Sequence, residues 1–136
     1  MNKLNEYIQM LCSDLNINTP SIKYVSTLPN TQLARLNLFK NVIEIKKGIS
    51  SPDLYFAVAH ELRHIWQYKT GALNIDTYNY DSSLKGYNLQ PEEVDANAYA
   101  TIVMNELFGL EPKFEGLSEE AKKAIHSRIN EICLCQ

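Results

Sequence analysis

Apolar side chains recur every three or four residues in three stretches of the chain, the pattern of helices that bury one face. The pattern predicts helices over residues 5–16, from about 51 to 70 and from 118 to about 133, and Pro91 and Gly109 indicate another from 90 to 107. The apolar positions that define the first, second and fourth helices are Leu4, Ile8, Leu11 and Leu15; Leu54, Val58, Leu62 and Ile65; and Ala121, Ala124, Ile125, Ile129 and Ile132.

Residues at the ends of the two middle helices support these boundaries. Ser51 can cap the second helix, and Pro52 suits its first turn. Gly71 is expected to end that helix, and Gly109 the next one, because glycine adopts the left-handed conformation common after a helix. Pro91 opens the third helix. Residues 70–90 between the two helices read as a long loop, which in a compact domain is more often functional than idle.

Alternating apolar and polar residues predict strands over 22–26, 34–38 and 42–46. Lys40-Asn41 could form the tight turn between the last two, because Asn tolerates a positive φ. We therefore expect a small three-stranded antiparallel sheet. With the helices it gives an α+β fold, and the 136 residues fit a single domain, 1–136.

Composition narrows the classes of function. A net charge of −3 and a pI near 5.6 provide no basic surface for direct nucleic-acid binding. No apolar run is long enough to cross a membrane, and the first residues lack the apolar core of a signal peptide. We therefore expect a cytoplasmic protein with no membrane partner. The odd number of cysteines, Cys12, Cys133 and Cys135, favours thiols over disulfides and leaves their role open.

The chemistry is concentrated in His60-Glu61-Leu62-Arg63-His64 on the second predicted helix. Residues four apart lie on one face of a helix, so His60 and His64 can bind one Zn²⁺ together. Glu61 is placed to take a proton from water as a general base. The same five residues could also be an accidental match on a solvated helix face, but the helical flanks and a possible third ligand downstream favour a metal site.

A catalytic zinc site needs a third protein ligand and an open position. Glu92, Glu93 and Asp95, at the start of the third predicted helix, are the candidates. Position alone leaves the choice open, because each could instead be a solvent-facing carboxylate in a first helical turn.

The segment Glu93-Val94-Asp95-Ala96-Asn97-Ala98-Tyr99-Ala100 resembles the glutamate helix of the gluzincin metallopeptidases, and most closely that of small gluzincins and ImmA/IrrE-like peptidases. The likeness covers roughly residues 50–108. It implies a zincin-like fold with one Zn²⁺ held by His60, His64 and Glu93. It also implies that Asn97 orients a metal ligand from behind. We expect Glu92 and Asp95 to be the solvent-facing carboxylates.

The sequence offers several candidates for the residue that stabilises the oxyanion and one for the strand that binds the substrate. Tyr78, Tyr80 and Tyr87 in the long loop are candidate donors to the oxyanion, whereas Arg63 should turn away from the ligand face. A peptide substrate could add to the edge of the sheet, for which the strand at 42–47 is the expected edge.

These features predict zinc-dependent peptide-bond hydrolysis, with an intracellular peptide or protein as substrate. The resemblance to ImmA-type peptidases makes a transcriptional regulator a reasonable target. The alternative is a non-catalytic or latent zincin-fold binding module in a regulatory or mobile-element context. The intact general base, Glu61, argues against that alternative.

Overall fold

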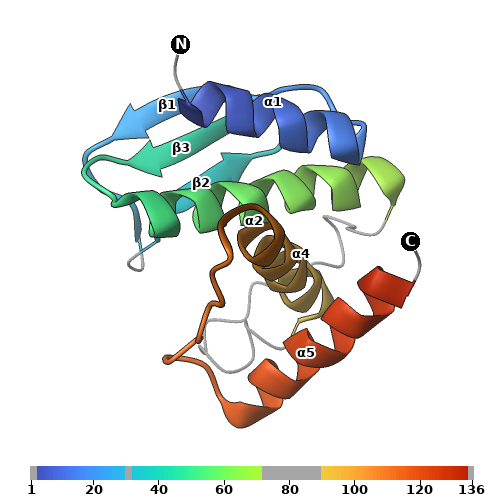
Figure 1. Cartoon of the computed structure of the whole chain (residues 1–136). Helices are drawn as coiled ribbons and strands as arrows, with labels where there is room; N and C mark the ends of the chain where they lie inside the picture. Colours follow the sequence, from blue (N-terminus) through green and yellow to red (C-terminus); the bar gives the residue numbers. More distant parts are fainter. Residues whose placement is uncertain (1–2, 30–31, 72–89, 135–136) are drawn as a thin grey trace.

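The computed structural model describes residues 3–29, 32–71 and 90–134. These residues form an α+β structure of four helices and a three-stranded sheet. In chain order the elements are α1 (Lys3–Leu15), β1 (Ser21–Val25), β2 (Ala34–Asn37), β3 (Val42–Lys46), α2 (Ser51–Thr70), α4 (Pro91–Phe108) and α5 (Glu119–Leu134). Figure 1 shows α1 and the sheet at one end of the molecule and α5 at the other, with α2 and α4 between them.

The sheet is mixed, and the prediction of an antiparallel sheet was wrong. Its strand order is β1-β3-β2, with β1 parallel and β2 antiparallel to β3. The turn between β2 and β3 reverses the chain, so β3 runs in the same direction as β1 and pairs with it along its other edge. The strand expected at the edge is therefore central, which explains why Ile43 and Ile45 are almost completely buried. Within the described chain, the sheet edges belong to β1 and β2.

The turn between β2 and β3 has the predicted chemistry. Asn41 adopts a positive φ of 53°, which an Asn side chain tolerates better than most. Across the two strands, Arg35 lies directly opposite Glu44, and their side chains form an ion pair at 2.7 Å. The hairpin therefore holds its register through both the turn and a cross-strand pair.

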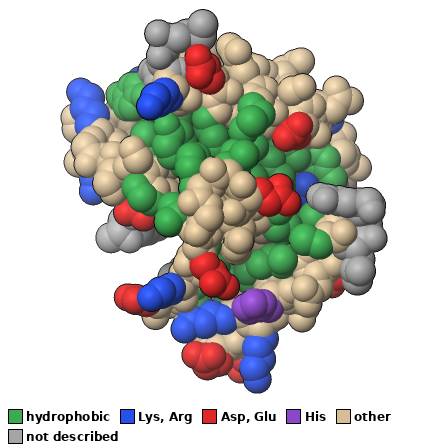
Figure 2. Space-filling model, viewed as in Figure 1, with side chains coloured by type: hydrophobic (Ala, Val, Ile, Leu, Met, Phe, Trp, Pro, Cys, Tyr) green, Lys and Arg blue, Asp and Glu red, His purple; other side chains and the backbone are tan. Residues whose placement is uncertain are grey.

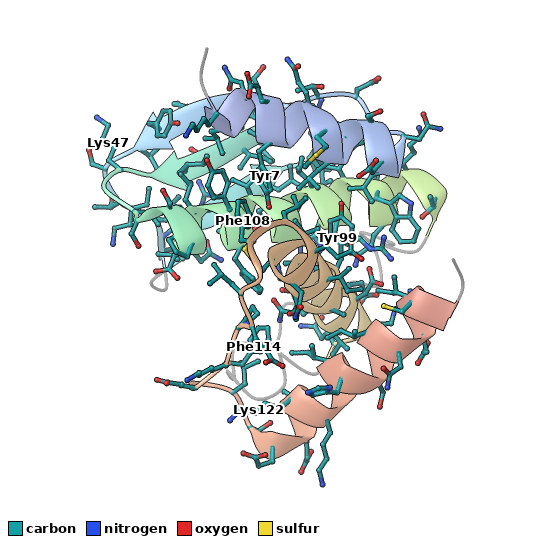
Figure 3. The ribbon with its side chains drawn as sticks, viewed as in Figure 1. Tyr7, Lys47, Tyr99, Phe108, Phe114 and Lys122 are labelled. Atoms are coloured by element: carbon teal, nitrogen blue, oxygen red, sulfur yellow. The ribbon has the colours of Figure 1, made fainter. Side chains whose placement is uncertain are left out.

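The main core lies where α1, α2 and the sheet meet, and it includes Ile8, Leu11, Ile43, Ile45 and Leu62. At its margin, Tyr7 of α1 donates a hydrogen bond to the carbonyl of Tyr55 in α2, at 2.8 Å. The ring of Phe108, at the end of α4, stacks on Tyr55 and lies beside Tyr7 (Figure 3). These contacts join α1, α2 and α4.

The ends of α2 largely follow the prediction. The helix begins with Pro52 in its first turn and ends at Gly71, whose φ of 86° is left-handed. The cap, however, is Ser50 rather than Ser51, because the carbonyl of Ser50 already accepts the hydrogen bond from the Leu54 amide. The Ser50 side chain makes no capping bond.

Helix α4 is enclosed by other elements over most of its length. It packs against α2 on one side and against α5 on the other, where Val94 and Ala98 meet Ile125. Gly109 ends it with a left-handed φ of 64°, as predicted. Helix α5 begins after Ser118, whose hydroxyl accepts a hydrogen bond from the Ala121 amide.

Hydrophobic side chains gather over the middle of the face shown in Figure 2. Leu107, Phe108 and Leu110 are exposed at the C-terminal end of α4. At ~1.5 Å per residue, this end lies about 20 Å along the helix from Glu93.

Among the described residues, no helix combines the length and apolar composition that a bilayer crossing would require.

Candidate metal centre

Three side chains from α2 and α4 converge on one point. His60 and His64 lie one turn apart on α2, and Glu93 faces them from the first turn of α4. The Glu93 carboxylate lies 3.1 Å from His60 Nε2 through Oε1, and 2.9 Å from His64 Nε2 through Oε2. The two Nε2 atoms are 3.1 Å apart. His64 and Glu93 are buried and His60 is partly buried, so the cluster is largely shielded from bulk water.

The donor set and its spacing fit a bound cation. Two imidazoles and one carboxylate form a known ligand set of catalytic zinc sites, which keep a fourth position open. Ligand atoms bound to one tetrahedral zinc lie roughly 3.3 Å from each other, close to the separations seen here. Atoms that carry lone pairs repel at such distances unless a cation or a shared proton lies between them. The cluster therefore suits Zn²⁺, although the same ligands can hold other divalent metals.

When no cation is bound, protons balance the negative charge of this cluster. Burial lowers the pKa of His64, but the hydrogen bond and negative charge of Glu93 outweigh burial and raise this pKa to about 9. Burial raises the pKa of Glu93, yet the two histidines hold it well below the ordinary value of 4.5. Glu93 is thus a carboxylate that attracts positive charge, whether proton or metal.

Glu61 follows His60 on α2 and lies close enough to the cluster for both histidines and Glu93 to affect its pKa. Burial raises this pKa above the ordinary value of 4.5, His64 and His60 oppose the shift, and Glu93 adds to it. A partly buried carboxylate beside a metal cluster is placed to exchange a proton with water held there.

Both histidines are also held by an amide on the other side of the ring. Asn97 Oδ1 lies 2.8 Å from His60 Nδ1, one helical turn after Glu93. Gln67 Oε1 lies 2.8 Å from His64 Nδ1. Each ring therefore directs Nε2 towards the cluster and Nδ1 towards an amide oxygen. Asn97 thus contacts His60, and its role in orienting a metal ligand stays a prediction. Gln67 was not singled out from the sequence.

Asp95 is buried, and the expectation that it faces solvent was wrong. Only 7% of it is exposed. It accepts two hydrogen bonds from Arg63, at 2.7 and 3.0 Å, one from Gln67 at 2.7 Å and one from Arg128 of α5 at 2.8 Å. Burial raises the pKa of Asp95, but these donors, Arg63 first, hold it below the ordinary value of 3.8. Asp95 therefore joins α2, α4 and α5 and lies outside the candidate cluster of His60, His64 and Glu93.

The family comparison covers both helices that build this site. A family model described as "Putative metallopeptidase family (DUF6782)" matches residues 7–133, nearly the whole chain. The chain belongs to this metallopeptidase family. No curated protein and no solved structure matched it.

The structure does not place the other predicted site residues of this metallopeptidase family member in the cluster. Tyr78, Tyr80 and Tyr87, the candidate oxyanion donors, lie outside the described residues. Arg63 is directed away from the cluster, because it pairs with Asp95 and its guanidinium lies 3.6 Å from the centre of the Trp66 ring. Glu92 is only half-buried, and its backbone carbonyl, not its carboxylate, accepts a hydrogen bond from Gln67.

Two signals in the sequence could have identified the residues that were missed. Gln67 follows His64 by three residues, so a helix places both side chains on one face. Asp95 lies beside the small or apolar residues Val94, Ala96 and Ala98, which indicate a helix enclosed on more than one side. A carboxylate in such a helix must find cationic or hydrogen-bonding partners.

Proposed function

We propose that this protein is a zinc-dependent peptidase of the gluzincin type. In this proposal His60, His64 and Glu93 hold one Zn²⁺, and Glu61 is the general base. The observation that carries the proposal is the convergence of two Nε2 atoms and one carboxylate, with all ligand atoms within 4.8 Å of one another. Membership of a metallopeptidase family supports the same reaction.

The proposed roles follow from what each group can do. A Zn²⁺ ion at this site would act as a Lewis acid on the peptide carbonyl and lower the pKa of water. The Glu61 carboxylate would accept a proton from the attacking water and pass it to the nitrogen of the leaving amine. Asn97 would keep the His60 ring turned so that Nε2 faces the metal, since its Oδ1 lies beside Nδ1.

The assignment to the gluzincin type and the choice of substrate are supported by the resemblance to small gluzincins and ImmA/IrrE-like peptidases. We propose a cytoplasmic enzyme that cleaves a peptide or protein, with a transcriptional regulator as the first substrate to test. Sheet pairing remains part of this proposal, but the pairing strand has to be β1 or β2, because β3 is bonded on both sides.

Metal analysis tests the ligands, and one histidine provides a matched control. Elemental analysis of the purified protein after zinc loading and desalting should give about one Zn²⁺ per chain. His60→Ala and His64→Ala should abolish binding. His126→Ala should not, because His126 is exposed on α5. A folded wild type that takes up no metal would refute the proposal.

Glu61→Gln separates catalysis from binding. This variant should keep the metal and the fold but lose cleavage of a peptide library that the wild type cleaves, because an amide cannot act as the base. If Glu61→Gln lost zinc as completely as His60→Ala, or turned over substrate at the wild-type rate, the role of Glu61 would be wrong. A metal-loaded wild type with no cleavage of any library peptide or regulator would favour the binding-module alternative.

A further inference from the structure

Gln67 connects the metal cluster to the buried carboxylate of Asp95. It lies on α2 one turn after His64 and is only 1% exposed. Its amide nitrogen donates to the carbonyl of Glu92 at 2.8 Å and to Asp95 Oδ2 at 2.7 Å. Its amide oxygen lies 2.8 Å from His64 Nδ1. All three polar contacts of this side chain are therefore made inside the protein.

The chemistry of these partners allows only one orientation of the Gln67 amide. A backbone carbonyl can only accept a hydrogen bond. Asp95 also accepts here, because two arginines donate to it and stabilise its ionised form. The amide nitrogen must face both of them. If the amide were flipped, its oxygen would lie against two acceptors, and buried groups would lose their hydrogen bonds.

This orientation determines where the proton of the His64 ring lies. Gln67 Oε1 can only accept, so the nitrogen facing it, Nδ1, must carry a proton. A neutral imidazole with a proton on Nδ1 has its lone pair on Nε2. In this structure His64 Nε2 lies 2.9 Å from Glu93 and 3.1 Å from His60 Nε2. When no cation is bound, Glu93 attracts a second proton to this Nε2; once that proton is displaced, the Nε2 lone pair points into the cluster.

We propose that Gln67 is a positioning residue, which is itself oriented by Asp95 and holds His64 in the Nδ1-protonated form with Nε2 free to bind a metal. The proposal rests on the proposed metal-dependent function, and it adds to it a buried chain from Arg63 through Asp95 and Gln67 to one ligand. Gln67 itself does not touch the metal or the substrate.

Gln67→Met tests the proposal, with Arg128→Gln as the matched control. Methionine has similar length but no strong acceptor for the Nδ1 proton. Arg128→Gln removes a donor to Asp95 Oδ1 and leaves the bond between Asp95 Oδ2 and Gln67 in place. Both variants disturb the buried network, but only the first removes the acceptor of His64.

Two measurements are made on the wild type and on both variants. The first is the ¹⁵N NMR spectrum of the histidine rings in metal-free protein at alkaline pH, which shows the tautomer of His64. The second is zinc affinity in competition with a chromophoric chelator. We expect the Nδ1-protonated form in the wild type and in Arg128→Gln, with similar zinc affinity. Gln67→Met should show a mixture of tautomers and roughly 10–100-fold weaker zinc binding.

The results distinguish the role of Gln67 from the proposed zinc-dependent function. An Nε2-protonated His64 in the wild type would overturn the proposal, even if Gln67→Met did not fold. So would a Gln67→Met variant with an unchanged tautomer and unchanged zinc affinity, or an Arg128→Gln variant that weakened zinc binding as strongly as Gln67→Met. A wild type that shows the expected tautomer but binds no zinc would instead refute the proposed function and leave the orienting role of Gln67 supported.

Discussion

Asp95→Ala should be among the most destabilising single substitutions on α4. The carboxylate receives four hydrogen bonds, from Arg63, Gln67 and Arg128. Arg63 is only 7% exposed, so its guanidinium could not regain full hydration after the change. Arg128 has a side chain about one-third exposed and could turn to water. The main cost therefore comes from Arg63, a charge left buried without its partner.

Removing one partner of a buried ion pair costs about 3–5 kcal/mol. The bond to the more exposed Arg128 adds little, roughly 0–1 kcal/mol. Domains of this size are stable by about 5–15 kcal/mol, so the loss is a large fraction of the total. With a shift of roughly 3–5 °C per kcal/mol for such a chain, the Tm should fall by ~10–20 °C.

The assay is thermal unfolding followed by circular dichroism, in a chelator so that bound metal does not contribute to the Tm. Glu92→Ala is the control, because Glu92 lies three residues before Asp95 on the same helix but is half-buried and contributes only its backbone to the network. Its loss should be about 0.3–1 kcal/mol, the usual contribution of an acidic side chain near a helix start.

A second variant tests the cause. Adding Arg63→Met to Asp95→Ala removes the unpaired charge and should recover part of the lost stability. If Asp95→Ala lowered the Tm no more than Glu92→Ala, the buried pair would not be a major source of stability. If Arg63→Met made the double variant worse by its full single effect, the unpaired charge would not be the cause of the loss.

Three further predictions concern the cluster. Glu93→Ala should weaken zinc binding far more than Glu92→Ala in chelator competition, because only Glu93 faces both histidines; equal losses would refute the ligand assignment. Asn97→Ala should weaken zinc binding by only ~10–100-fold, since it removes a partner of His60 and not a ligand; complete loss of metal would make Asn97 a ligand. In metal-free protein the pKa of His64 is raised from 6.5 to about 9, so its stabilising effect is complete below pH 6.5 and is lost as pH rises through 9. Urea unfolding should show this alkaline loss without metal and a smaller one with zinc; a metal-free protein that gained stability from pH 7 to 9 would contradict it.

The local features of this fold were predictable because each depends on a few neighbouring residues. Three of the helices follow from apolar spacing, the turn at Asn41 from the tolerance of Asn for positive φ, and the start and end of α4 from Pro91 and Gly109. The His60–His64 pair follows from the period of the helix alone. The convergence of Glu93 with them was expected through a family likeness, since nothing within α4 itself specifies which side faces α2.

The strand order could not be obtained in the same way. Alternation of apolar and polar residues assigns a strand and its buried face, but it does not identify the neighbour on each side. A meander would have placed β2 in the centre, whereas here β3 is central. The one available indication was the Val42–Ile45 stretch, which carries apolar side chains at three of four positions and suits a strand bonded on both edges.

Asp95 shows how a carboxylate can be misread when its helix is considered alone. Near the start of a helix, an acidic side chain is favourable even in water, so the presence of Asp95 required no further explanation. Once α5 covers the outer side of α4, the same carboxylate is enclosed and needs compensating charge. Arg63 and Arg128 supply it from helices on opposite sides. Asp95, which the sequence suggested would face solvent, thus joins three helices. It does so through a hydrogen bond with Gln67, the side chain proposed to orient His64.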